Sequence, residues 1–153
     1  MQSMNAVELR TGYMPLIIGG IGAMGSALLM PWIQFASPYA GDITRTGLQL
    51  RGGWIFALAL VVLAVVARRE ALSPSATTRT ALLIGLVVLG IAGAVEYRDL
   101  TRLAAGFNAE FAQAKLGFGI FAMGLGLTFS LAGVLKRRIA LQPIPESADQ
   151  FAG

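Results

Sequence analysis

The chain contains neither cysteine nor histidine. Without cysteine it has no disulfide, no thiol redox chemistry and no thiolate metal site. Without histidine it has no imidazole general base, no His-ligated haem or chlorophyll and no ordinary zinc site. These absences exclude quinone–disulfide oxidoreductases, cytochromes and most metalloenzymes. We therefore expect no catalytic residue, no metal and no cofactor.

Charged residues are also scarce. They make up 13% of the chain, against 56% hydrophobic residues, whereas a soluble domain carries about 25% charged residues. The net charge is +4 and the pI is about 10.1. The basic residues stand mainly at the ends of apolar segments, where they would meet lipid headgroups. We therefore expect the lipid bilayer, and not a nucleic acid, as the partner of these charges.

Four apolar blocks account for most of the sequence, and their interiors hold no Asp, Glu, Lys or Arg. A helix needs about 20 apolar residues to cross a bilayer. An amphipathic helix of a soluble protein would instead carry charge on its outer face in every turn or two. We predict membrane spans at about 13–33, 50–67, 80–97 and 116–135.

The predicted fold class is all-α: a membrane-embedded up-down four-helix bundle with a short amphipathic outer helix. The bundle would occupy residues 13–140, preceded by a cytoplasmic head at 1–12 and followed by a flexible cytoplasmic tail at 141–153. Only a short polar segment around Pro74 connects the second and third spans. Because proline ends a helix and a short link joins neighbours, these two spans should be antiparallel.

The distribution of Lys and Arg predicts the orientation. With the N-terminus inside, seven of the 12 basic residues are cytoplasmic and five are outside. Arg68-Arg69 and Lys136-Arg137-Arg138 directly follow the second and fourth spans. By the positive-inside rule, both termini should be cytoplasmic. We expect the membrane to be a bacterial inner (plasma) membrane.

The first outer loop has two interpretations. Pro38 and Gly41-Asp42 mark a turn, and the residues after it alternate only loosely in polarity. An irregular loop is our first interpretation and a small hairpin over the membrane surface is the second. Trp32 and Trp54 stand at the ends of the first two spans, where we expect them to join an aromatic belt at the membrane interface.

The second outer segment, 96–115, lacks proline and carries apolar residues at helical spacing. It predicts an amphipathic helix on the outer surface or an extension of the third span. Its apolar stripe would cap the protein's own bundle or dock a partner or lipid, and its charges would form an interfacial ion-pair cluster. The candidate outer-face residues are Glu96, Arg98, Asp99, Arg102, Phe107 and Phe111.

Small residues recur in the first, third and fourth spans. In lipid, helices associate through close backbone approach, which rows of small residues permit. We expect these rows to pack within the bundle first, and to contact a partner or a second copy otherwise. The candidate helix-packing residues are Gly22, Ser26, Gly90, Ala94, Ala122, Gly126 and Ser130.

Short motifs add a resemblance. The first span ends in Pro31-Trp32, a Gly52-Gly53-Trp54 sequence enters the second span, and Gly117–Gly119 enters the fourth. In this order the chain resembles the small, uncharacterised four-span membrane proteins of the actinobacterial type, and the resemblance implies a topology. The arrangement is also similar to claudin-type tetraspans. That group's outer-loop cysteine pair is missing here, so this likeness implies no junctional role.

These observations favour a non-catalytic integral membrane protein: an accessory, assembly or stabilising subunit of a larger membrane complex. The alternative is an oligomeric small-solute transporter or channel. A transporter usually keeps an ionisable residue at mid-membrane, and the four predicted spans have none. The partner would be another membrane protein or a second copy of the chain.

Overall fold

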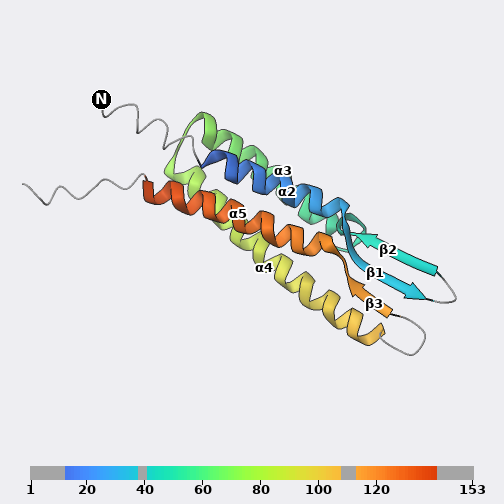
Figure 1. Ribbon diagram of the computed structural model, residues 1–153. Helices are drawn as coiled ribbons and strands as arrows, with labels where there is room; N and C mark the ends of the chain where they lie inside the picture. The colour runs from blue at the N-terminus through green and yellow to red at the C-terminus, as the bar shows by residue number, and fades with distance from the viewer. Residues whose placement is uncertain (1–12, 38–40, 108–112, 141–153) are drawn as a thin grey trace, which may run out of the picture.

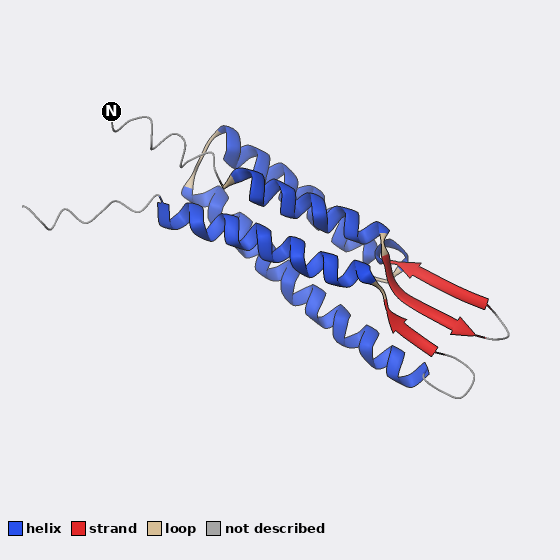
Figure 2. Cartoon of the chain, in the orientation of Figure 1, coloured by secondary structure: helices blue, strands red, loops and turns tan. Residues whose placement is uncertain are grey.

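A computed structural model describes residues 13–37, 41–107 and 113–140. In this part of the chain, helices lie side by side and a small sheet extends from one end of the bundle (Figures 1 and 2). We call this end the sheet end, and the end where α3 meets α4, at residues 73–75, the hairpin end. The helices are α2 (Met14–Leu29), α3 (Gly53–Leu72), α4 (Ala76–Phe107) and α5 (Phe118–Ala140). The expected head 1–12 and tail 141–153 lie outside the described residues.

The sheet contains β1 (Pro31–Ser37), β2 (Gly41–Thr46) and β3 (Gln113–Leu116), in the order β2-β1-β3. Both pairings are antiparallel, and Phe35 of β1 lies between Ile43 and Ala114. A short 3₁₀ helix, η1 (Gly47–Gln49), leads from β2 to α3. The segment expected to be the first outer loop therefore contains a hairpin, and the irregular-loop interpretation is wrong. The fold is mostly helical, but the all-α class is wrong in this one respect.

Two helix boundaries also differ from the sequence-based expectation. The first span was expected to continue to residue 33, but α2 ends at Leu29. Pro31 has no N–H and forces Met30 into extended backbone, with φ −81° and ψ 158°, so the chain leaves the helix and enters β1. Beyond Glu96, α4 extends to Phe107 without a break, and Gln113–Leu116 forms a strand. The segment predicted as an outer helix is thus, up to Phe107, a continuous extension of α4.

Two helices in the described residues are long and apolar enough to cross a membrane. They are α4, over Ala76–Gly106, and α5, over Phe118–Lys136. The 16 residues of α2 span only about 24 Å at 1.5 Å per residue. The last six residues of α3 include Arg68, Arg69 and Glu70, which shorten its apolar part.

The closest helix contact in the core joins α2 to α5. A Cβ atom at Gly20 would lie 2.5 Å from the Gly126 carbonyl oxygen, and one at Gly126 would lie 2.7 Å from the Gly20 carbonyl oxygen. Neither glycine can therefore carry a side chain without separating the helices. The buried Ser130 hydroxyl crosses the same contact and donates a 3.3 Å hydrogen bond to the Ile17 carbonyl.

Trp32 joins the sheet to the bundle. It is only 1% exposed, so its predicted place in an interfacial belt is wrong. Its indole N–H donates a 2.8 Å hydrogen bond to the Ala27 carbonyl, and its ring meets Phe56 edge-on at 6.1 Å. Gly47 and Gly119 leave space for the ring, because a Cβ atom on either would lie 2.8 Å from its Nε1. Trp54, by contrast, is 75% exposed.

Candidate functional site

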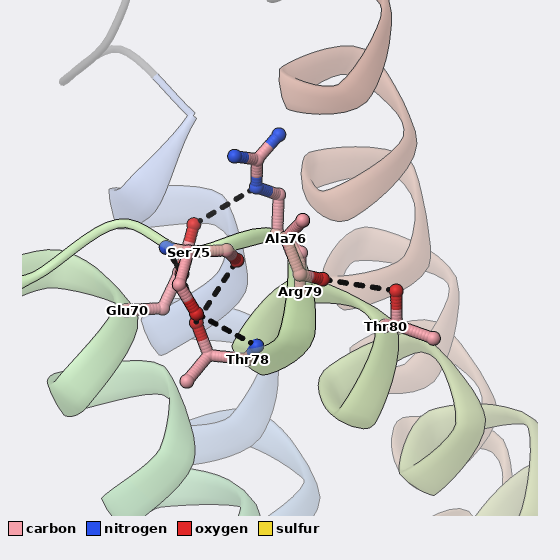
Figure 3. A network of polar contacts seen from close by, with 6 residues as sticks. All are labelled: Glu70, Ser75, Ala76, Thr78, Arg79 and Thr80. Carbon is pink, nitrogen blue, oxygen red and sulfur yellow. Dashed lines mark hydrogen bonds and ion pairs between the residues drawn. The ribbon is translucent and has the colours of Figure 1, made fainter.

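The hairpin end contains a polar cluster around Glu70 (Figure 3). The Glu70 side chain is fully buried. Its Oε1 accepts a 3.0 Å hydrogen bond and ion pair from Arg79 Nε. Its Oε2 accepts a 2.9 Å hydrogen bond from the Ser75 N–H and another from the Thr78 hydroxyl. The carboxylate is thereby held by donors from the start of α4.

Helix ends explain why an acid stands at this position. Glu70 lies in the last turns of α3, where a negative charge opposes the helix dipole. The same carboxylate faces the first turn of α4, where unpaired N–H groups and the dipole favour an anion. Ser75 caps α4, because its Oγ accepts a 3.0 Å hydrogen bond from the Thr78 N–H. The cluster therefore fixes the α3–α4 turn.

Sequence reasoning missed the role of Glu70, Thr78 and Arg79. One signal was present: Glu70 is an acid at the C-terminal end of a helix, and a capping serine of the next helix, Ser75, stands five residues later. An acid placed against one helix dipole suggests that a second helix begins beside it.

The predicted outer-face residues do not form the expected ion-pair cluster. Glu96 is half-buried, while Arg98, Asp99 and Arg102 are exposed. No ion pair joins any of these four side chains to another described residue. The Phe107 side chain and the whole of Phe111 lie outside the described part.

The predicted helix-packing residues fall into two groups. Gly126 and Ser130 lie in the α2–α5 contact, and Ala122 packs at the edge of the core. Gly90 faces α5, since a Cβ atom there would lie 2.9 Å from Leu127 Cδ2. Gly22, Ser26 and Ala94 are exposed.

The exposed side of α2 consists largely of small residues. A Cβ atom at Gly19 or Gly22 would meet nothing within 4 Å, so these positions face away from the bundle. Ala23 and Ser26 share this side and are also exposed. The Ser26 hydroxyl donates to the Gly22 carbonyl at 3.1 Å, so it is satisfied within its own helix. We define the small-residue face of α2 as Gly19, Gly22, Ala23 and Ser26.

Comparison with protein families, with curated proteins and with solved structures gives no match. Within the described ranges, no group of three or more Asp or Glu side chains is placed to hold a metal ion. The function is therefore inferred from the exposed side chains of the helices and from the small-residue face of α2.

Proposed function

We propose that this protein is a four-span integral membrane protein that acts as a non-catalytic accessory, assembly or stabilising subunit of a larger membrane complex. The bundle supports the four spans. α2 and α3 run alongside α4 and α5, which have the length and composition to cross a membrane (Figure 1). Large apolar side chains are exposed on every one of these helices, including Ile18, Leu58, Val88 and Leu125. Hydrocarbon is the solvent that such a surface requires.

The orientation that we propose places the sheet outside a bacterial inner membrane and the hairpin end in the cytoplasm. α2 begins, and α5 ends, at the hairpin end (Figure 1). Arg68 and Arg69 lie at this end, and Lys136 lies near the end of α5. Basic residues concentrate on the cytoplasmic side of membrane proteins. Both termini would then be cytoplasmic.

The observation that carries the accessory role is the small-residue face of α2. In a bilayer, an exposed Leu or Val side chain packs equally well against lipid and against another protein, so it gains little from binding a partner. A helix face made of Gly, Ala and Ser gains more from the close approach of another helix, through backbone packing and weak C–H hydrogen bonds. Among the described residues, no atom lies within 4 Å of a Cβ position at Gly19 or Gly22 of this face. A transmembrane helix of a partner protein is the occupant that we propose.

Co-purification in a gentle detergent tests this function. The wild-type chain should recover a larger membrane protein in a fixed stoichiometry, identified by mass spectrometry. Gly22→Leu should abolish the recovery, because its side chain projects from the face without disturbing the bundle. Gly106→Leu is the matched control: Gly106 is also helical and exposed, with no atom within 4 Å of a Cβ position.

Two results would contradict the accessory role. One is a stoichiometric complex that survives both Gly22→Leu and Gly19→Leu. The other is recovery of the chain alone, as a homo-oligomer that transports a solute in liposomes, which would establish the oligomeric transporter or channel instead.

A further inference from the structure

The sheet has two edge strands, and they differ in what lies beside them. β3 is the shorter edge, with four residues, and α4 runs alongside it (Figure 1). The side chains of Leu100 on α4 and Ala114 on β3 are both buried. β2 forms the opposite edge, and all its residues from Gly41 to Arg45 are exposed. Within the described part of the chain, one edge of the sheet is therefore covered and the other is open.

The open edge presents backbone hydrogen-bonding groups. In an antiparallel edge strand, every second residue directs both its N–H and its C=O away from the sheet. The Thr46 N–H donates a 3.1 Å hydrogen bond to Gln49 Oε1, so the end of β2 is satisfied locally. Over residues 41–45, no backbone hydrogen bond joins β2 to a described residue outside β1. A row of donors and acceptors at the spacing of a strand is thus left on this edge.

The open edge also lacks the features that usually block an edge strand. Natural proteins prevent edge pairing with lysine, proline, a β-bulge or a covering element. β3 carries Lys115 and lies beside α4. β2 has neither lysine nor proline, and its pairing with β1 is regular over residues 41–45. Three of its six residues, Ile43, Thr44 and Thr46, are β-branched and favour extended backbone. The open edge is therefore suited to a further strand.

Side chains on β2 indicate which strand would fit. Ile43 lies opposite Phe35 in the sheet, yet it is 49% exposed. Arg45 lies opposite the buried Ile33 and shares the face of Ile43, whereas Asp42 lies on the other face. An antiparallel neighbour would match these residues with an apolar side chain opposite Ile43. It would also place an acid two residues earlier, opposite Arg45, and a base directly after the apolar residue, opposite Asp42.

A second copy of the chain does not supply this strand. The strands continue from the bundle roughly along its long axis (Figure 1). The β2 strands of two copies with the same orientation in a membrane would therefore pair in parallel. A two-fold axis along the strands turns one sheet over relative to the other. The face with Ile43 in one copy would then adjoin the face with Asp42 in the other, and Ile43 would stay uncovered.

We propose that the open edge of β2 binds an extended segment of the partner protein, outside the membrane, as a fourth strand of the sheet. The segment is antiparallel to β2 and has the order acid, any residue, apolar residue, base. Backbone hydrogen bonds provide the affinity, and the side chains opposite Ile43, Arg45 and Asp42 provide the specificity. This inference rests on the accessory function, which supplies the partner, but it uses a different surface from the small-residue face of α2.

Hydrogen exchange, followed by mass spectrometry, tests the added strand directly. The complex that the wild-type chain recovers in gentle detergent is compared with the wild-type chain overproduced and purified alone. The amides of residues 41–45 that point away from β1 should exchange at least about tenfold more slowly in the complex, because new strand hydrogen bonds protect them. The amides of β3, at the covered edge, should exchange at the same rate in both samples.

Substitutions at the two edges provide matched comparisons. Ile43→Lys places a lysine on the open edge and should lower recovery of the partner at least about tenfold. Gln113→Lys introduces the same residue at an exposed position of β3 and should leave recovery unchanged. Arg45→Glu should lower recovery roughly three- to tenfold, because it places an acid opposite an acid. Lys115→Glu, also exposed on β3, should have no effect. The thermal unfolding midpoint of each variant shows that it remains folded.

The outcomes separate this inference from the accessory function. A complex may depend on Gly22 while the amides of residues 41–45 exchange as they do in the chain alone. That result overturns the added strand and leaves the accessory function in place. Equal loss of recovery from Ile43→Lys and Gln113→Lys also overturns the added strand. A wild-type chain that recovers no partner contradicts both proposals.

Discussion

The buried Glu70 cluster gives the sharpest prediction of stability. Glu70→Ala removes a carboxylate that accepts hydrogen bonds from Ser75, Thr78 and Arg79. It also leaves the Arg79 guanidinium, whose side chain is 22% exposed, without its ion-pair partner. Breaking a buried ion pair by removing one member costs about 3–5 kcal/mol, and we expect Glu70→Ala to destabilise the protein by this amount.

The same cluster offers a smaller, more selective change. Thr78→Val keeps a β-branched side chain of the same shape but removes the hydroxyl that donates to Glu70. A hydrogen bond to a charged group contributes about 1.5–3 kcal/mol, so the loss should fall in this range. Thr80→Val is the matched control. The Thr80 hydroxyl is exposed and donates a 2.9 Å hydrogen bond to the Ala76 carbonyl of its own helix (Figure 3). Its removal should therefore cost less than about 0.5 kcal/mol.

Thermal unfolding in a single detergent measures all three variants. The midpoint temperature of unfolding should fall most for Glu70→Ala, less for Thr78→Val and very little for Thr80→Val. If Thr78→Val and Thr80→Val behaved alike, the Glu70 carboxylate would not be anchoring the start of α4, and the account of the α3–α4 turn would be refuted.

Two further predictions concern topology and packing. A single cysteine at Thr44, in the sheet, should react with a membrane-impermeant thiol reagent on intact cells, while one at Thr77, at the hairpin end, should react only after lysis; the chain has no native cysteine to interfere. The reverse labelling pattern would contradict the proposed orientation. Gly126→Ala should destabilise by about 1–3 kcal/mol in detergent unfolding, because its Cβ atom would lie 2.7 Å from the Gly20 carbonyl oxygen, whereas Gly124→Ala should be neutral or slightly stabilising. Equal effects would mean that α2 and α5 do not meet at Gly126.

The helices could be predicted from the sequence because hydrophobic length and proline act locally. The approximate positions of α3, α4 and α5 follow from apolar runs, and the break after Leu29 follows from Pro31. β3 could not be predicted in this way. Gln113–Leu116 is too short to show a pattern, and it forms a strand because Phe35, about 80 residues earlier in the chain, provides the edge beside Ala114.

The surface of each helix was harder to predict than its length. Small residues occur on both sides of α2, and composition alone does not tell which side meets α5. Gly20 faces Gly126, while Gly22, only two residues later, faces outward. The burial of Trp32 has the same cause, because Gly47 and Gly119 that surround it are distant in sequence. Such contacts depend on tertiary packing, which a single sequence does not display.

Photo-crosslinking from the small-residue face of α2 tests the central claim most directly. A photoreactive amino acid replaces Ala23 on this face, and in a second variant it replaces Val61, which is 61% exposed on α3. After illumination of intact cells, the account predicts that position 23 forms a discrete adduct with one membrane protein, and that position 61 labels lipid. Adducts of the chain only with itself, or with lipid alone at both positions, would contradict the accessory role.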